Sequence, residues 1–268
     1  MEHTSERKNP RRQKALVTGA SAGIGAAFAS RLAREGYDLV LVARDEKRLQ
    51  MRAKELRGEY GVGVEVLPAD LTDTDQCARV ERAAAAGLDL LVNNAGFGTF
   101  GSFWKLPLDR EEEEIRLNVL ALVRLTHAAL RKMVERGHGA IINVSSLASF
   151  QPMPFNATYG ATKAYVTSFT EALAEELRGT GVTVQALCPG FTRTEFQQRA
   201  GLRVSGVPAF MWMTAEEVVD ASLAALQKGQ VVVVPGAPYK ALALLSGIAP
   251  RQVLRRIGGM IGRSQFAR

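Results

Sequence analysis

Cysteine is scarce in this chain of 268 residues, which has only Cys77 and Cys188. Neither residue belongs to a Cys-X-X-Cys pair or lies near a histidine at metal-ligand spacing, so the sequence predicts neither a disulfide framework nor a metal site. Residues 1–14 are charged and lack the apolar run of a signal peptide, and apolar runs elsewhere are shorter than the ~20 residues that span a membrane. We therefore expect a protein of the reducing cytoplasm.

Acidic residues are absent from Ala221 to the C-terminus, whereas basic residues crowd both ends of the chain. The formal net charge of +7 arises at these ends, while the middle of the chain is mildly acidic. No recognition motif or aromatic platform for nucleic acid accompanies the basic residues. A flexible basic tail over residues 1–12 and a basic helical extension over residues 237–268 explain the charge better, so we expect no nucleic-acid partner.

Short apolar runs rich in valine, leucine and isoleucine alternate with longer helical patterns from Lys14 onward. This alternation predicts an α/β domain with a doubly wound parallel sheet and helices on both of its faces. Seven strands are expected, at residues 15–19, 38–43, 64–69, 89–96, 140–146, 182–190 and 231–236. Helices are expected to begin near Gly23, Asp45, Asp73, Asp109, Thr158 and Thr214.

Two helix boundaries carry particular signals. Thr214 lies three residues before Glu217, a spacing that predicts a capping box in which each side chain binds the other's backbone amide. Pro250 interrupts the apolar pattern near the C-terminus and predicts two separate helices there.

A glycine-rich turn follows the first expected strand, with the sequence Thr18-Gly19-Ala20-Ser21-Ala22-Gly23-Ile24-Gly25. Gly19 permits the tight turn, Gly23 lets the backbone approach a pyrophosphate, and Gly25 permits close packing of helix on strand. Free amides at the helix start attract the anion, and Ser21 adds a hydroxyl donor. Taken alone, the turn is also compatible with a purely packing role.

The end of the second strand indicates which dinucleotide binds. An acidic residue usually holds the ribose of NAD there, but this chain has Val42-Ala43-Arg44. A small residue followed by a guanidinium leaves room for a 2′-phosphate and supplies a planar charged group to bind it. Asp45 comes next, and we expect it to cap the following helix. The sequence therefore favours NADP(H), with NAD(H) as the less favoured alternative.

Tyr159 and Lys163 are four residues apart at the start of an expected helix, which places them on one face. The Lys163 ammonium is expected to lower the pKa of the phenol, whose reference value of about 10 makes it a poor base at neutral pH. An exposed pair without function has the same spacing, so this pair needs independent support. Tyr165 points elsewhere on the helix and is not a candidate.

That support comes from Ser146, which ends the preceding strand at the edge where ligands approach an open parallel sheet. With these residues the chain resembles the short-chain dehydrogenase/reductase family in its single-domain form, from the first strand to the seventh. The motifs that carry the resemblance are, in chain order, Thr18–Gly25, Asp70-Leu71, Asn93-Asn94-Ala95-Gly96, Asn118, Ser146, Tyr159, Lys163, Pro189-Gly190 and Thr194. Each motif alone is compatible with a structural role, and their joint order indicates the family.

The resemblance implies a Rossmann-fold catalytic domain over residues 13–236 and an oxidoreductase that moves hydride between NADP(H) and a carbonyl or alcohol substrate. In that family pattern, Tyr159 exchanges a proton with the substrate oxygen and Ser146 binds the same oxygen. Lys163 lowers the pKa of the tyrosine and binds the nicotinamide ribose, and Asn118 anchors a water that supplies protons to Lys163. The reaction requires no metal.

The resemblance also implies the cofactor contacts. Asp70 is expected near the adenine amino group with Leu71 beside it, and Asn94 and Gly96 are expected along the adenosine. The segment from Pro189 to Thr194 is expected to hold the nicotinamide amide. The complete expected set is Gly19, Ser21, Gly23, Ile24, Gly25, Arg44, Asp70, Leu71, Asn94, Gly96, Tyr159, Lys163, Pro189, Gly190, Thr192 and Thr194.

Two segments, residues 191–213 and the C-terminal extension, indicate the substrate and the partners. Residues 191–213 are expected to cover the substrate, and their apolar side chains favour a hydrophobic carbonyl compound. The C-terminal extension interleaves apolar and basic residues, which suits packing on a partner subunit or, as the less favoured alternative, a membrane surface. The resemblance implies a homodimer or homotetramer. An alternative function for this fold is a dinucleotide-binding redox sensor without turnover, although a sensor has no need of the proton-transfer residues.

Overall fold

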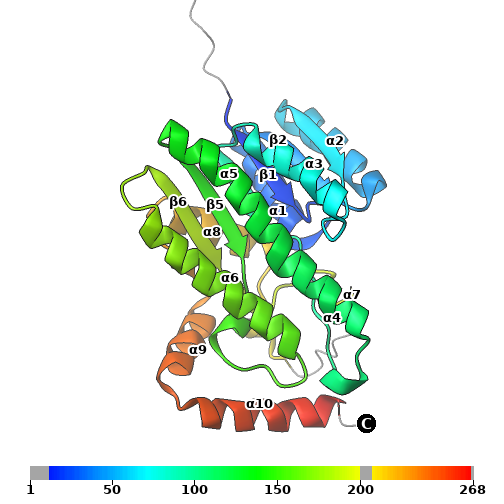
Figure 1. Cartoon of the computed structure of the whole chain (residues 1–268), viewed down its shortest axis with the longest axis vertical. Helices are drawn as coiled ribbons and strands as arrows, with labels where there is room; N and C mark the ends of the chain where they lie inside the picture. The colour runs from blue at the N-terminus through cyan, green and yellow to red at the C-terminus, as the bar shows by residue number, and fades with distance from the viewer. Residues whose placement is uncertain (1–11, 200–206, 267–268) are drawn as a thin grey trace, which may run out of the picture.

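The computed structural model describes residues 12–199 and 207–266 (Figure 1). Most of the expected basic tail, and residues 200–206 of the segment expected to cover the substrate, lie outside the described residues. Within them, no helix combines the length and the apolarity needed to cross a membrane.

Seven parallel strands form one sheet in the order β3-β2-β1-β4-β5-β6-β7. The strand order reverses between β1 and β4, and a crevice for ligands is expected at the carboxyl ends of strands at such a point. This arrangement confirms the predicted doubly wound fold. The strands are β1 (Lys14–Thr18), β2 (Asp38–Ala43), β3 (Val64–Pro68), β4 (Leu90–Asn93), β5 (Gly139–Val144), β6 (Val182–Leu187) and β7 (Val232–Val233).

Helices cover both faces of the sheet (Figure 1). One apolar cluster joins the sheet to α1, α2 and α8, and a second joins its other face to α3, α5 and α6. A π-helical turn (Arg116–Ala121) connects α4 to α5. The helices are α1 (Gly23–Arg34), α2 (Glu46–Tyr60), α3 (Thr74–Ala85), α4 (Leu108–Ile115), α5 (Leu122–Arg136), α6 (Ala157–Glu176), α7 (Phe196–Arg199), α8 (Ala215–Leu226), α9 (Ala237–Ile248) and α10 (Arg251–Phe266).

The predicted helix starts are confirmed to within one residue, and the caps explain why. The Asp45 side chain accepts a hydrogen bond from the Arg48 amide at 3.0 Å and so caps α2 as expected. Both bonds of the predicted capping box are present, because Thr214 binds the Glu217 amide and Glu217 binds the Thr214 amide. Side-chain oxygens thus satisfy amides that the first turn of a helix leaves unpaired.

The last strand is shorter than predicted, since β7 comprises two residues of the expected range 231–236. Pro235 has no amide hydrogen to donate to a neighbouring strand. Gly236 has a φ of 86° and turns the chain directly into α9. These two residues end the ladder and start the C-terminal extension.

The extension packs on the domain through Tyr239 of α9, which is 1% exposed. Its hydroxyl accepts a hydrogen bond from the Phe191 amide at 3.0 Å and donates one to the carbonyl of Met211. A Cβ on Gly190 would lie 2.2 Å from the tyrosine ring, so only glycine fits there. The first helix of the extension therefore fastens both ends of the segment 191–213.

The second helix of the extension, α10, lies along the lower edge of the molecule in Figure 1. Two of its glycines, Gly258 and Gly262, face the loop before α6. A Cβ on Gly258 would lie 3.0 Å from Pro154, and one on Gly262 would lie 2.3 Å from the ring of Phe155. Phe155 has a φ of 65°, a conformation that is uncommon for a residue with a side chain. The close approach of α10 supports this loop four residues before Tyr159.

Candidate active site

The turn after β1 has the geometry of a phosphate-binding turn. Gly19 and Gly23 have φ values of 66° and 55°, and a Cβ on Gly25 would lie 2.3 Å from the carbonyl oxygen of Gly19. The N-terminus of α1, capped by Ala22, receives no side-chain hydrogen bond, unlike those of α2, α3 and α8. Its amides are therefore available to an anion, and the turn fits the pyrophosphate of a dinucleotide.

Asn94 fastens this turn to β4. Its side-chain amide donates to the carbonyl oxygens of Thr18 at 2.9 Å and Gly19 at 3.4 Å. The Thr18 hydroxyl in turn accepts from the amides of Asn94 and Ala95 at 2.9 and 3.0 Å. The sequence placed Asn94 along the adenosine, whereas its side-chain donors in the structure hold the two strand ends together.

Arg44 and Asp70, two residues expected to bind the cofactor, lie close together at the carboxyl ends of β2 and β3. The Arg44 guanidinium is 3.7 Å from Asp70 and 3.9 Å from Glu113 of α4, and its side chain is 68% exposed. A side chain this exposed and loosely paired is free to bind a further anion. Leu71 is buried in the core, which leaves its backbone as the part that can reach a ligand.

A second arginine lies beside this region. Arg48 of α2 donates from one nitrogen to both carboxylate oxygens of Glu195, at 3.0 and 2.9 Å. This bond ties α2 to the segment that follows β6. Nothing in the sequence pattern marked the pair.

Tyr159 and Lys163 lie on one face of α6, as predicted. The Lys163 Nζ is 5.7 Å from the centre of the Tyr159 ring and donates to the carbonyl of Val144 at 2.8 Å. Lys163 is 5% exposed. Ser146 follows β5, and its Oγ accepts a hydrogen bond from the Ala148 amide at 3.1 Å. The structure thus brings the phenol, the amine and the serine to the same strand end.

Asn118 lies in the π-helical turn and is 1% exposed. Its amide nitrogen donates to the Phe97 carbonyl at 2.8 Å and to the Thr162 hydroxyl at 3.1 Å, while its Oδ1 accepts from the Phe97 amide at 3.1 Å. A Cβ on Gly96 would lie 2.8 Å from this Oδ1 and 3.5 Å from the Lys163 Nζ. Asn118, Gly96 and Lys163 therefore meet in one place.

The electrostatics of the phenol differ from the expectation. Burial raises the pKa of Tyr159 to about 12, although the Ser146 hydroxyl opposes the rise. Burial also lowers the pKa of Lys163 to about 8. For the protein alone, the expectation that Lys163 makes Tyr159 unusually acidic is wrong, because removal from water disfavours charge on both side chains.

The segment after β6 carries the remaining expected residues. Pro189 is buried, and the Thr192 hydroxyl donates to the Gly190 carbonyl at 3.1 Å. Thr194 packs on the phosphate-binding turn, since a Cβ on Gly23 would lie 3.1 Å from its side chain. This contact joins the two ends of the expected cofactor site.

The family model for short chain dehydrogenase matches residues 13–203. The chain belongs to this family. It is an oxidoreductase that acts on carbonyl or alcohol groups with a nicotinamide dinucleotide, as the many dehydrogenases and reductases among its relatives show. The dinucleotide fits the uncapped start of α1 and the glycine turn described above.

The chain is similar to a 7beta-hydroxysteroid dehydrogenase of Collinsella aerofaciens, with 36% identity over 67% of this chain and 68% of that protein. A short-chain dehydrogenase of Sphingobium yanoikuyae with NADPH bound is 41% identical with a TM-score of 0.81, covering 91% of this chain and 95% of that one. The bulky-bulky ketone specific alcohol dehydrogenase of Comamonas testosteroni is 35% identical with a TM-score of 0.78, covering 91% of this chain and 94% of that one. A family member from Burkholderia phymatum with NAD bound is 26% identical with a TM-score of 0.77, covering 87% of this chain and 92% of that one.

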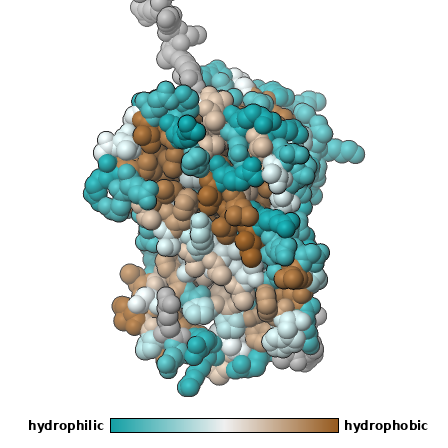
Figure 2. All heavy atoms as spheres, in the orientation of Figure 1, coloured by the Kyte–Doolittle hydropathy of each residue, from teal (hydrophilic) through white to brown (hydrophobic). Residues whose placement is uncertain are grey.

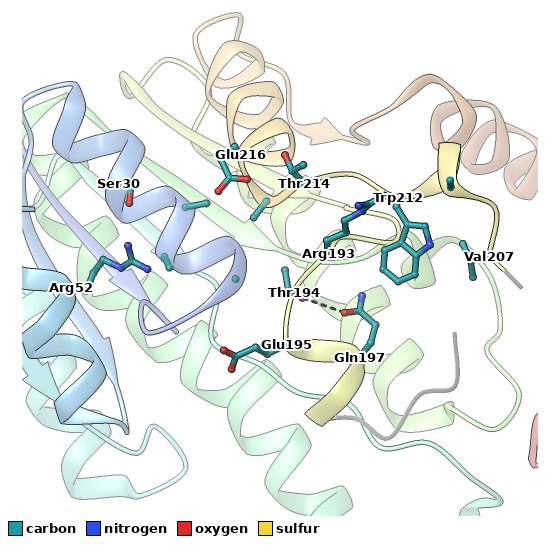
Figure 3. Close-up of a pocket in the computed structure, with 15 residues that line it drawn as sticks. Ser30, Arg52, Arg193, Thr194, Glu195, Gln197, Val207, Trp212, Thr214 and Glu216 are labelled. Carbon is teal, nitrogen blue, oxygen red and sulfur yellow. Dashed lines mark hydrogen bonds between the residues drawn. The ribbon is translucent and has the colours of Figure 1, made fainter. Parts of the chain in front are cut away.

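An open cavity of about 990 Å³ adjoins the phosphate-binding turn in this dehydrogenase (Figure 3). Gly23 of α1 lines one side, and Thr194, Arg193 and Trp212 of the segment after β6 line the other. Trp212 also packs against Phe191, with ring centres 5.6 Å apart. The segment expected to cover the substrate therefore forms one wall of a ligand-sized space beside the cofactor turn.

The position of the Tyr159 ring depends on Gly98. A Cβ on Gly98 would lie 2.8 Å from the ring, so replacement by alanine must displace the phenol. We predict that Gly98→Ala lowers kcat about tenfold or more, because small misplacements at a reacting centre are costly. Gly58→Ala is the control, since its Cβ would enter open space on α2. Wild-type kcat in Gly98→Ala would contradict this account.

Proposed function

We propose that this dehydrogenase reduces bulky hydrophobic ketones or aldehydes, that it prefers NADPH, and that Tyr159 is its proton donor. The observation that carries the proposal is the convergence of Tyr159, Ser146 and Lys163 at the carboxyl ends of the strands. A dinucleotide on the turn after β1 would reach along the same edge of the sheet. These three side chains supply the proton chemistry that carbonyl reduction requires.

The bound nicotinamide supplies the hydride. Tyr159 donates its proton to the substrate oxygen, and the Ser146 hydroxyl donates a hydrogen bond to that oxygen as negative charge develops. With its pKa raised to about 12, Tyr159 is protonated at neutral pH, which is the state that reduction requires. An alkoxide is a stronger base than this phenolate, so the transfer is favourable. Lys163 then returns a proton to the phenolate.

Asn118 is the fourth residue of the proposed catalytic group. It positions Thr162 and the Phe97 backbone next to Lys163. A water on its Oδ1 would share that oxygen with the Phe97 amide, which a carbonyl oxygen permits because it has two lone pairs. Such a water, held by Asn118, would pass protons to Lys163.

The preference for NADPH rests on Arg44. Its exposed guanidinium lies at the end of β2, where the ribose of the adenosine is held in dinucleotide folds. Arginine binds a phosphate with two parallel donors, which an unphosphorylated ribose cannot use. The similar structure with NADPH supports this preference, and the one with NAD shows that the family also uses the other cofactor. The backbone of the turn after β1 and the segment from Pro189 to Thr194 would hold the rest of the cofactor.

A hydrophobic substrate is favoured by the aromatic residues around the phenol. The rings of Phe100 and Phe196 lie 6.2 and 5.7 Å from that of Tyr159. Apolar surface of this kind stabilises a bound apolar group by about 25 cal/mol per Å² buried. The similarity to a hydroxysteroid dehydrogenase and to an enzyme for bulky ketones points to the same substrate class.

Replacing Tyr159 by phenylalanine tests the reaction. With a panel of lipophilic ketones and aldehydes and of small keto acids, the wild type is expected to oxidise NADPH with the lipophilic compounds. Tyr159→Phe is expected to lower kcat by about 10²–10⁴-fold with NADPH binding retained, because only the proton donor is lost. Tyr165→Phe, on the exposed side of the same helix, serves as the control. Undiminished turnover in Tyr159→Phe would refute the assignment.

Replacing Arg44 by alanine tests the cofactor preference. We predict that the Kd for NADPH rises by about 10-fold or more while that for NADH changes little, since the lost donors face the 2′-phosphate. Arg178→Ala, at an exposed position just after the C-terminus of α6, is the control. Fluorescence titration with both dinucleotides measures the change, and equal effects on the two would count against the assignment.

We also propose a homo-oligomer. Large apolar side chains lie exposed on α9, where Leu244, Leu245 and Ile248 are 70%, 62% and 82% exposed. Leu120 of the π-helical turn and Val134 of α5 are exposed as well. Apolar side chains gather on that face in Figure 2. Such patches mark interfaces. Sedimentation velocity is expected to give two or four times the chain mass of 29.0 kDa. A monomer that instead sediments with anionic vesicles would replace this proposal with membrane contact.

A further inference from the structure

Two glutamates of α4 point into the protein. Glu111 is 3% exposed and Glu114 is fully buried, and they lie one helical turn apart on the same face. The two glutamates between them differ, because the side chains of Glu112 and Glu113 are 53% and 25% exposed and pair with arginines of their own helix region. A buried carboxylate is costly unless it is compensated. The buried pair therefore requires an explanation that its neighbours do not.

The hydrogen bonds satisfy only half of each carboxyl group. Oε2 of Glu114 accepts from the amide and the hydroxyl of Thr99, both at 2.8 Å. Oε2 of Glu111 accepts from the Thr158 hydroxyl. The Oε1 atom of each glutamate is buried and has no hydrogen-bond partner among the described residues. Burial of these oxygens without a donor disfavours the charged form of the carboxyl group.

The pair lies against the proposed catalytic residues. The helix α4 packs on α6, and Glu111 accepts its hydrogen bond from Thr158, the residue before Tyr159. Glu114 acts electrostatically on Lys163 and Tyr159 and raises the pKa of each. Glu111 faces it from its own helix, and Cys188 at the end of β6 is a further titratable group that acts on both α6 residues. Burial raises the pKa of Glu114 to about 7; Thr99 and Lys163 oppose this rise and Glu111 adds to it. Glu114 thus changes charge near neutral pH.

We propose that Glu114 is a positioning residue whose negative charge keeps Lys163 protonated. The proposal rests on the proposed function. In each reduction one proton passes from Tyr159 to the substrate oxygen, and the Lys163 ammonium replaces it and is itself reprotonated from solvent. A carboxylate beside the ammonium extends the pH range in which this proton is present.

The direction in which the pH profile shifts follows from the charges of Glu114 and Lys163. As pH rises through about 7, Glu114 becomes charged and supports the ammonium. As pH rises further through about 8, Lys163 loses its proton and reduction declines. Removing the carboxylate therefore moves the alkaline decline of the reduction rate to lower pH.

The first test is the pH profile of kcat for ketone reduction in Glu114→Gln. Glutamine keeps an oxygen for Thr99 but carries no charge, so the contact with the loop is retained. We expect the alkaline limb to move down by about one pH unit, which corresponds to a rate about tenfold lower on that limb. Glu112→Gln, on the exposed side of the same helix, should keep the wild-type profile. Rescue of the limb by Glu114→Asp is expected as well.

A second test does not depend on turnover. Infrared titration of the wild type is expected to show the carbonyl band of a neutral carboxylic acid that disappears as pH rises through about 7. The band should be absent in Glu114→Gln and present in Glu112→Gln. In Glu111→Gln its midpoint should move to lower pH, because the neighbouring carboxyl is gone, while the alkaline limb of kcat stays in place.

The outcomes separate the two proposals. If the wild type reduces no ketone with NADPH, the proposed function fails, and the infrared titration still tests the carboxyl pair. If the wild type reduces ketones but Glu114→Gln and Glu112→Gln have the same alkaline limb, the role of Glu114 is refuted. A uniform loss of rate at every pH in Glu114→Gln would likewise refute it, since this is the signature of a purely structural contact.

Discussion

Lys163 carries its ammonium group into the interior, where it donates to the Val144 carbonyl and little of it contacts solvent. A charge in such a place is tolerated only when the surrounding dipoles and charges compensate it. The Val144 carbonyl at the end of β5 accepts from the ammonium, and the carboxyl group of Glu114 on α4 acts on it electrostatically. The hydrogen bond from Lys163 to Val144 also ties α6, the helix that bears the phenol, to the end of β5.

Buried polar side chains between the strands and helices fix the same geometry. Asn93 of β4 donates to Asn143 of β5 at 2.9 Å and to Thr126 of α5 at 3.0 Å, and Asn143 donates to Thr170 of α6 at 3.0 Å. The Ser145 hydroxyl donates to the Lys163 carbonyl at 2.8 Å. Apolar packing alone tolerates small slips of one element along another, whereas a chain of directional bonds does not. These bonds therefore fix how β4, β5, α5 and α6 fit together at the active-site end of the sheet.

The sequence allowed the fold to be predicted because its signals are local. Alternating apolar runs mark the strands, and the side chains of Asp45 and Thr214 cap helices that begin immediately after them. The grouping of Ser146, Tyr159 and Lys163 could also be predicted, since the tyrosine and the lysine are one helical turn apart and Ser146 follows the strand before that helix.

Features that depend on distant contacts could not be predicted. Four successive glutamates look like a solvated helix face, and only the packing of α4 on α6 buries two of them. Tyr239 looks like one more residue of a variable tail, yet it fastens the segment over the cavity. The acidity of Tyr159 was misjudged because spacing reveals a neighbouring amine but not the loss of water around both groups.

The contact of α10 with Phe155 links the outer surface of the enzyme to its active site. Gly258 and Gly262 of this helix back the loop that leads into the helix bearing the phenol. A side chain at either position would press on Pro154 or Phe155. Variation in this outlying helix therefore bears on catalytic geometry as well as on the exterior of the enzyme.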